Sequence, residues 1–202
     1  MSALRADLEL IAGLVSPGIR VLDVGCGDGA LLHHLVTEKG VEGRGLELSA
    51  ANVSRCVAKG LSVVQGDADT DLADYPEDAF DLVILSQTIQ AMRSPRPVLL
   101  HLLRIGRGAA VSFPNFGHWK ARMRFLQGHV FVHGPGSTWD GTSNIHPCTA
   151  RDFITLCVSI NARIEGAWSL GGSRPRPFKP GRSLANLRAE TAVFHLSRNS
   201  SA

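Results

Sequence analysis

The chain of 202 residues lacks several features that mark membrane, secreted and metal-binding proteins. No apolar run is long enough to cross a membrane. Charged residues interrupt the apolar residues near the N-terminus, so we expect an amphipathic helix over residues 3–14 and no signal peptide. The cysteines are far apart and lack the spacing of paired ligands, which predicts free thiols in a cytoplasmic protein and no metal site. They are Cys26, Cys56, Cys148 and Cys157.

The chain also lacks repeats, low-complexity segments and a strong charge excess. Its net charge is only +3, and the basic residues between 104 and 124 are dispersed. A solvated face or a surface that docks an acidic protein explains them better than a nucleic-acid site. The length and ordinary apolar content predict a single domain over residues 1–202.

The most informative stretch runs from Arg20 to Gly29. Its apolar residues at 21, 22 and 24 predict a buried parallel strand. Three glycines follow at every second position (Gly25, Gly27 and Gly29), and they allow a sharp turn and close approach of a ligand to the backbone. Apolar residues from Ala30 onward predict a helix that ends before Gly40. A strand, a glycine turn and a helix in this order are typical of a nucleotide-cofactor site.

The glycines alone leave two cofactors open. Gly25, Gly27 and Ala30 satisfy the dinucleotide pattern G-x-G-x-x-G/A, which would indicate an oxidoreductase. However, Asp23 precedes the first glycine, and Asp67 follows a strand predicted at 61–65. With the alternating glycines, these acids resemble the S-adenosylmethionine (SAM) site of class I methyltransferases. This resemblance favours SAM, or its product S-adenosylhomocysteine, as the cofactor.

Strand and helix patterns alternate from residue 20 to residue 113, and two further strands are expected at 162–170 and 190–197. This alternation predicts an α/β fold with a doubly wound sheet. With the resemblance above, it implies a Rossmann-like class I methyltransferase fold, with a mostly parallel seven-stranded sheet and helices on both faces. Residues 134–141 are expected to form a glycine-rich loop, and 173–182 a surface loop rich in proline and basic residues.

The acidic residues receive separate roles in this interpretation. Glu47 closes the second strand, where a carboxylate can accept hydrogen bonds from both ribose hydroxyls. By resemblance, Asp67 would accept from the adenine amino group, with Asp69 as a competing candidate, and Asp23 would order the turn or meet the amino end of the methionine moiety. The predicted cofactor-binding residues are Asp23, Gly25, Cys26, Gly27, Gly29, Glu47, Leu48, Asp67, Ala68, Ser86 and Gln87.

Three later segments carry a closer resemblance. Residues 85–91, 112–119 and 144–149, together with the opening at 5–9, resemble the MetW family of methionine biosynthesis. This resemblance covers nearly the whole chain and departs mainly at 128–141 and 173–182. It implies a partnership with the homoserine O-acyltransferase MetX. Because SAM is the downstream product of that pathway, a SAM-sensing regulator of the acyltransferase is our first hypothesis.

A SAM-dependent methyltransferase acting on a small-molecule acceptor is the alternative, and a dinucleotide-dependent oxidoreductase is the third hypothesis. Residues 115–146 would cover the acceptor pocket of a methyltransferase, and they include Asn115, His118, Trp119, Trp139, Asn144 and His146. His118 or His146 could act as a general base, although structural roles for both histidines are favoured. No Asn/Asp-Pro-Pro-Tyr motif follows the fourth strand, which argues against amino-methylation of DNA bases or glutamine. The sequence is also compatible with a homo-oligomer.

Overall fold

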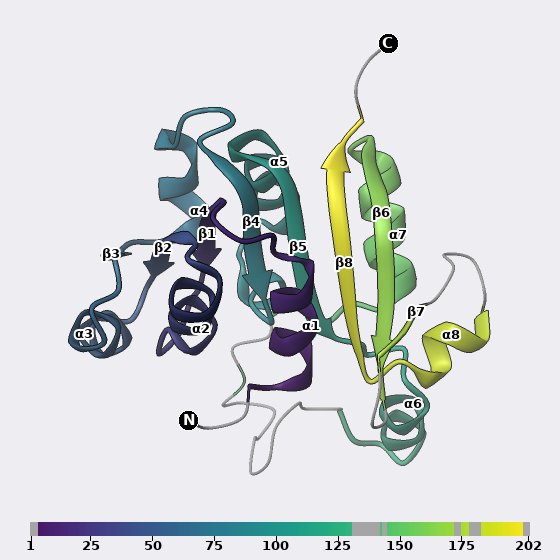
Figure 1. The fold of residues 1–202 in the computed structure, drawn as a ribbon. Coiled ribbons are helices and arrows are strands. Elements are labelled where there is room, and N and C mark those ends of the chain that lie inside the picture. The colour runs from purple at the N-terminus through teal and green to yellow at the C-terminus, as the bar shows by residue number, and fades with distance from the viewer. Residues whose placement is uncertain (1–3, 131–141, 143–144, 172–174, 178–182, 200–202) are drawn as a thin grey trace.

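The computed structural model describes residues 4–130, 142, 145–171, 175–177 and 183–199. Within these residues, eight strands form one sheet in the order β3-β2-β1-β4-β5-β8-β6-β7 (Figure 1). The strands are β1 (Arg20–Val24), β2 (Glu42–Glu47), β3 (Val63–Gln65), β4 (Phe80–Ser86), β5 (Gly106–Pro114), β6 (Ala162–Leu170), β7 (Arg176–Pro177) and β8 (Thr191–Arg198). The α-helices are α1 (Ala6–Leu14), α2 (Ala30–Lys39), α3 (Ala50–Ala58), α4 (Ala68–Asp71), α5 (Pro95–Ile105), α6 (Trp119–Leu126), α7 (Ala150–Ser159) and α8 (Ser183–Arg188), with 3-10 turns η1 (Leu72–Asp74) and η2 (Ile89–Ala91).

The first five strands are parallel, as the alternating pattern predicted. Val24 of β1 pairs with Leu46 of β2 and with Leu85 of β4, so the carboxyl ends of these strands meet at one edge of the sheet. β8 lies between β5 and β6 and runs antiparallel to both. Its arrow therefore points away from that of β4 in Figure 1. The predicted class I methyltransferase fold is confirmed, and its parallel half delivers the predicted site residues to the carboxyl edge.

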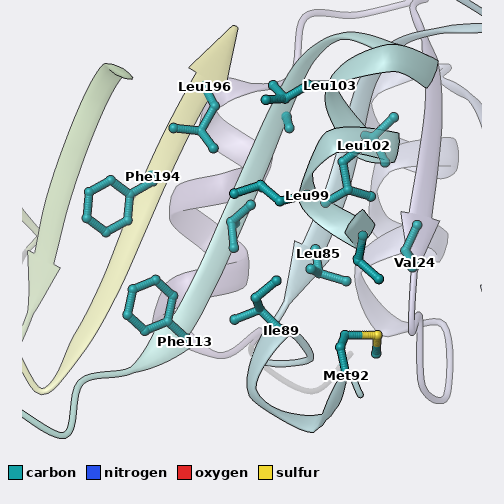
Figure 2. Packing of buried hydrophobic residues seen from close by; sticks show 14 of the residues in the cluster. Val24, Leu85, Ile89, Met92, Leu99, Leu102, Leu103, Phe113, Phe194 and Leu196 are labelled. Atoms are coloured by element: carbon teal, nitrogen blue, oxygen red, sulfur yellow. The ribbon is translucent and has the colours of Figure 1, made fainter. Parts of the chain in front are cut away.

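Helices cover both faces of the sheet (Figure 1). Alternate residues along each strand point to opposite faces. Leu22 and Val24 of β1 pack with residues of α5 and α7 in one cluster, whereas Val21 packs with residues of α1 and α2 in another. Figure 2 shows the first cluster, in which leucines of α5 lie against β4, β5 and β8. Asp23 lies two residues after Val21 on β1, so its side chain points to the same face, which α1 and α2 cover.

Three aromatic rings hold the antiparallel half of the sheet to the parallel half. Phe113 of β5 stacks on Phe194 of β8, with ring centroids 5.8 Å apart. Phe153 of α7 contacts both rings, with centroid distances of 4.8 Å. Each ring is almost fully buried, and truncating a buried phenylalanine typically costs about 3–5 kcal/mol. These contacts fix the end of β5, from which the chain enters the region of α6.

Local side-chain and backbone features define several helix boundaries. The Ser49 side chain accepts a hydrogen bond from the backbone of Asn52 and caps α3. Thr149 and Asp152 form a reciprocal capping box at α7. Pro95 stands in the first turn of α5, where its missing N–H needs no partner.

Other predictions need correction. Part of the predicted loop at 173–182 is β7, which pairs with Trp168 and Ser169 of β6 and adds an eighth strand to the predicted seven. Its signal was missed because two residues are too short for a periodic pattern. α8 was not predicted, and the first helix starts at Ala6 rather than residue 3. The glycine-rich loop at 134–141, Trp139 and Asn144 lie outside the described residues. No helix in the described part is long and apolar enough to cross a bilayer.

Candidate functional site

The glycine turn after β1 has the backbone conformation that its sequence predicts. Gly25, Gly27 and Gly29 all have positive φ, at 69°, 59° and 76°. A Cβ on Gly29 would lie 2.6 Å from Leu61 and one on Gly25 would lie 2.8 Å from Thr88, so these two glycines permit close packing. A Cβ on Gly27 would meet nothing within 4 Å. Gly27 therefore presents bare backbone to open space, as a site for a ligand requires.

Glu47 lies directly beside this turn. Its Oε2 accepts a hydrogen bond of 2.8 Å from the Gly27 N–H. Its Oε1 accepts from the Ser49 N–H at 2.9 Å and from Asn52 Nδ2 at 3.4 Å. A carboxylate offers about four lone-pair positions, so these bonds leave one position free and one weakly used. The carboxylate is thus oriented by the backbone and retains capacity for a hydroxyl donor.

Asp23 is a buried carboxyl group with no hydrogen bond or ion pair to any described residue, and it is only 2% exposed. Burial raises its pKa from 3.8 to about 7, and the negative charge of Glu47 adds to the shift, whereas the Arg5 guanidinium opposes it. Buried carboxylates normally have partners. An ammonium group from a ligand would supply one here.

Asp67 follows β3 at the same edge, but its carboxylate is already engaged. It accepts a hydrogen bond of 2.9 Å from the Asp69 N–H and forms an ion pair with Arg93. Asp69 in turn accepts from the backbone N–H groups of Arg93 and Ser94. Two of the about four lone-pair positions of the Asp67 carboxylate therefore remain for an adenine amino group, beside an Arg93 side chain that is largely exposed.

The remaining predicted cofactor-binding residues differ in which of their groups could contact a cofactor. The Cys26 side chain packs against Leu32 and Cys56, and burial raises the pKa of its thiol, so only its backbone is left for a cofactor. Ala68 is buried at the start of α4. Leu48, immediately after Glu47, is 66% exposed. An apolar side chain at this position can cover the flat face of a bound base.

Ser86 and Gln87 belong to a polar cluster that sequence reasoning did not identify. At its centre is Asp7 of α1, which is 4% exposed. Its Oδ2 accepts from Ser86 Oγ at 3.1 Å, Ser112 Oγ at 2.9 Å and Gln87 Nε2 at 3.2 Å. Arg5 Nε reaches its Oδ1 at 3.2 Å. Gln87 has a φ of 54°, a strained value for a residue with a side chain.

The sequence contained one signal for this cluster. Asp7 lies four residues before Ile11, so both fall on the same face of α1, and Ile11 is fully buried. A carboxylate on the buried face of a helix requires partners. Those partners come from strands far along the chain, at residues 86 and 112, which no local pattern could connect to residue 7.

The structure separates the two candidate catalytic histidines. His118 is buried and caps α6 through Nδ1, and burial lowers its pKa. His146 is exposed, and its ring lies 3.2 Å from the Arg93 carbonyl oxygen. Asn115 is fully used: its Nδ2 donates to the carbonyls of Asn186 and Ala189, and its Oδ1 accepts from Gly117 and Ala150. These contacts give His118 and Asn115 structural roles and leave His146 at the rim near Asp67.

Metal ligands do not gather anywhere in the part of the chain that the structure describes. No group of three or more histidine, cysteine, aspartate or glutamate side chains there is arranged to hold an ion. All four cysteines are free thiols. The carboxyl edge presents carboxylates, hydroxyls and backbone N–H groups.

Solved structures with the same architecture define the fold class. A SAM-dependent methyltransferase from Thermotoga maritima superposes with a TM-score of 0.71 at 13% identity, covering 96% of this chain and 88% of that chain. A SAM-dependent methyltransferase from Mesorhizobium loti gives the same TM-score at 18% identity, covering 96% and 98%. The fold is that of the class I methyltransferases.

The sequence comparisons then give the family. The family model described as "Methionine biosynthesis protein MetW" matches residues 5–196. The chain belongs to the MetW family. A curated relative from Rhodopirellula baltica, named "Bifunctional methionine biosynthesis protein MetXA/MetW", is 33% identical over 214 aligned residues, which cover 96% of this chain. The chain spans about a third of the length of the curated relatives it matches.

Proposed function

We propose that this protein binds SAM at the carboxyl edge of its sheet and acts as a partner and regulator of a homoserine O-acyltransferase of the MetX type. The observation that carries the proposal is the Rhodopirellula baltica relative, whose name joins MetXA and MetW in one chain. Fusion of two proteins in one relative supports a working association between their separate counterparts. We further propose a cytoplasmic location and one domain over residues 1–202, which the free thiols and the single sheet support.

The residues at the carboxyl edge fit SAM in charge and in shape. The bare backbone at Gly27 leaves room for the ligand, and Glu47 is oriented to accept from ribose hydroxyls. Asp23 is a buried carboxylate that lacks a partner, and the α-ammonium of SAM would provide one. SAM supplies a sulfonium methyl group that can be transferred when an acceptor is present. The base would lie between Leu48 and Ala68, with its amino group at Asp67 beside Arg93.

The partner surface in this proposal is α6 together with residues 127–130. Large apolar side chains are exposed there in unusual density: Trp119, Met123, Phe125, Leu126 and Val130. The helix carries Lys120, Arg122 and Arg124 and no acidic residue. Such a surface fits an apolar patch with an acidic rim. We assign this surface to the acyltransferase, and association of two copies of the chain is the competing outcome.

Calorimetric titration with SAM, with and without the purified acyltransferase, tests the cofactor and its coupling to the partner. A regulator requires SAM to bind the free and the complexed protein with different affinities, because coupling is reciprocal. Glu47→Gln should weaken SAM binding by about tenfold, the effect of losing charge from a carboxylate that accepts hydroxyl bonds. Glu42→Gln is the matched control, since Glu42 lies exposed at the opposite end of the same strand.

Each outcome decides between the hypotheses. SAM affinity that changes when the acyltransferase is added supports the regulator. The methyltransferase alternative would be favoured if the acyltransferase leaves the SAM affinity unchanged and the protein forms S-adenosylhomocysteine in the presence of small nucleophiles. Absence of SAM binding in every mixture would reject the proposed cofactor site.

Phe125→Glu tests the partner surface. The charge placed among apolar side chains should weaken binding of the acyltransferase by at least about tenfold and leave SAM affinity unchanged. Val158→Glu is the control, because Val158 is equally exposed on α7, outside this surface. Equal effects of the two variants would reject α6 as the contact. Sedimentation of the protein alone shows whether Phe125 instead holds two copies together.

A further inference from the structure

Arg5 is held by hydrogen bonds at the carboxyl edge, although it lies near the start of the described chain, at the N-cap of α1. Its Nε and Nη2 donate to the two oxygens of Asp7 at 3.2 and 3.3 Å. Its Nη2 also donates to Ser86 Oγ at 3.1 Å. Asp7 is itself buried and fixed by the hydroxyls of Ser86 and Ser112. The guanidinium is therefore held along one side by a rigid anchor.

The other side of the guanidinium remains available. A guanidinium has five N–H donors in a fixed plane. Nη1 makes no hydrogen bond to any described residue, and about half of the Arg5 side chain is exposed. Asp7 neutralises the charge only from the buried side. The exposed side thus presents the two N–H groups of Nη1, which can donate charge-assisted hydrogen bonds to a carboxylate.

Arg5 lies next to the place that the methionine end of SAM would occupy. Val24 pairs with Leu85, so the next residues, Gly25 and Ser86, are neighbours at the edge, and Arg5 is bonded to Ser86. The positive charge of Arg5 also opposes the rise that burial causes in the pKa of Asp23. Asp23 and Ser86 lie on the sheet face that α1 covers, by the alternation of side chains along β1 and β4.

The chemistry of the ligand matches this pair of charges. The ammonium and the carboxylate of the methionine moiety are attached to the same carbon atom. A residue that binds one group must therefore lie beside the residue that binds the other. We infer that Arg5, oriented by Asp7, binds the α-carboxylate of SAM while Asp23 faces the α-ammonium. This inference rests on the SAM site proposed above and adds a residue that selects for an amino-acid ligand.

Decarboxylated SAM isolates this contact, because it retains the adenosine, the sulfonium and the amino group and lacks only the carboxylate. The wild-type protein should bind SAM more tightly than decarboxylated SAM. Arg5→Ala should weaken SAM binding by about 10- to 100-fold, the effect of losing a hydrogen bond between charged groups, and change the affinity for decarboxylated SAM less than about twofold. Arg20→Ala is the control, since Arg20 pairs with Asp81 at the opposite end of β1.

The two ligands separate this inference from the proposed function. If Arg5→Ala changes the affinity for neither ligand, or weakens both equally while the variant unfolds at the wild-type denaturant concentration, Arg5 does not bind the carboxylate. If Arg5→Ala binds neither ligand because α1 is displaced, the Arg5→Lys variant tests the inference. Lysine keeps the positive charge but lacks the planar guanidinium. This variant should bind SAM with a reduced preference over decarboxylated SAM. An unchanged preference in Arg5→Lys would overturn the inference. A wild-type protein that binds neither ligand would reject the SAM site as a whole.

Discussion

Replacement of Asp23 by asparagine should make the protein more stable at neutral and alkaline pH and weaken its binding of SAM. Asp23 is 2% exposed at the end of β1 and has no hydrogen-bonding partner among the described residues. Asparagine has nearly the same shape and carries no charge. The substitution therefore removes the cost of an ionised carboxylate while keeping the packing of the strand.

The size of the effect follows from the pKa of Asp23. The shift from 3.8 to about 7 corresponds to about 4 kcal/mol of destabilisation when the carboxylate is ionised. Burial is the main cause, followed by the charge of Glu47, and Arg5 acts in the opposite direction. Between these two pKa values the folded protein binds more protons than the unfolded chain. The free energy of unfolding therefore falls as pH rises from about 4 to about 7, and it levels off above that.

Denaturant unfolding of wild type and Asp23→Asn measures this directly. The variant should gain relative stability of about 2–3 kcal/mol between about pH 5 and about pH 8. The wild-type affinity for SAM should decrease as the pH is lowered through about 7, because the ligand's ammonium group requires an ionised Asp23. This part of the pH dependence should be lost in Asp23→Asn.

Asp81→Asn is the matched control on β4. The Arg20 backbone N–H donates to the Asp81 carboxylate at 2.9 Å and lowers its pKa, so its ionised form is favoured in the folded state. This stabilisation is present at neutral pH and is lost only as pH falls through the lowered pKa. Asp81→Asn should therefore be destabilising and should keep the wild-type fall in stability between about pH 5 and about pH 8. Parallel stability curves for wild type and Asp23→Asn would refute the reasoning about Asp23.

Two further predictions concern local structure. Gly29→Ala should lower the free energy of unfolding by about 2–4 kcal/mol, because φ is positive and the new Cβ would lie 2.6 Å from Leu61. The Cβ of Gly27→Ala would point into open space. This variant should lose only about 1 kcal/mol of unfolding free energy, while its SAM binding weakens. Denaturant unfolding and calorimetry measure the two effects separately. Equal stability losses would contradict the difference in packing, and unchanged SAM affinity in Gly27→Ala would contradict the assignment of Gly27 to the ligand. Thr149→Ala removes the capping box of α7. It should lower the free energy of unfolding by about 1 kcal/mol without altering SAM affinity. A loss of SAM affinity would contradict this purely structural role.

The sequence was sufficient wherever a structural feature depends on neighbouring residues. The turn after β1 follows from three alternating glycines, and all of them have the positive φ that this pattern requires. The caps at Ser49 and Thr149 follow from side chains that reach backbone groups three residues away. The order of strands and helices up to β5 follows from hydrophobic periodicity. The roles proposed for Glu47 and Asp67 remain predictions, although both residues lie at the predicted edge of the sheet.

The tertiary structure decided what depends on residues far apart in the chain. Asp7 and Ser112 are separated by 105 positions and share a hydrogen bond. Arg93, which follows η2, pairs with Asp67 at the start of α4, 26 positions earlier in the chain. The insertion of β8 between β5 and β6, and the short β7, are likewise set by pairing with distant strands. Local propensities and periodicity describe one segment at a time, whereas these contacts arise only when the sheet assembles and brings its edges together.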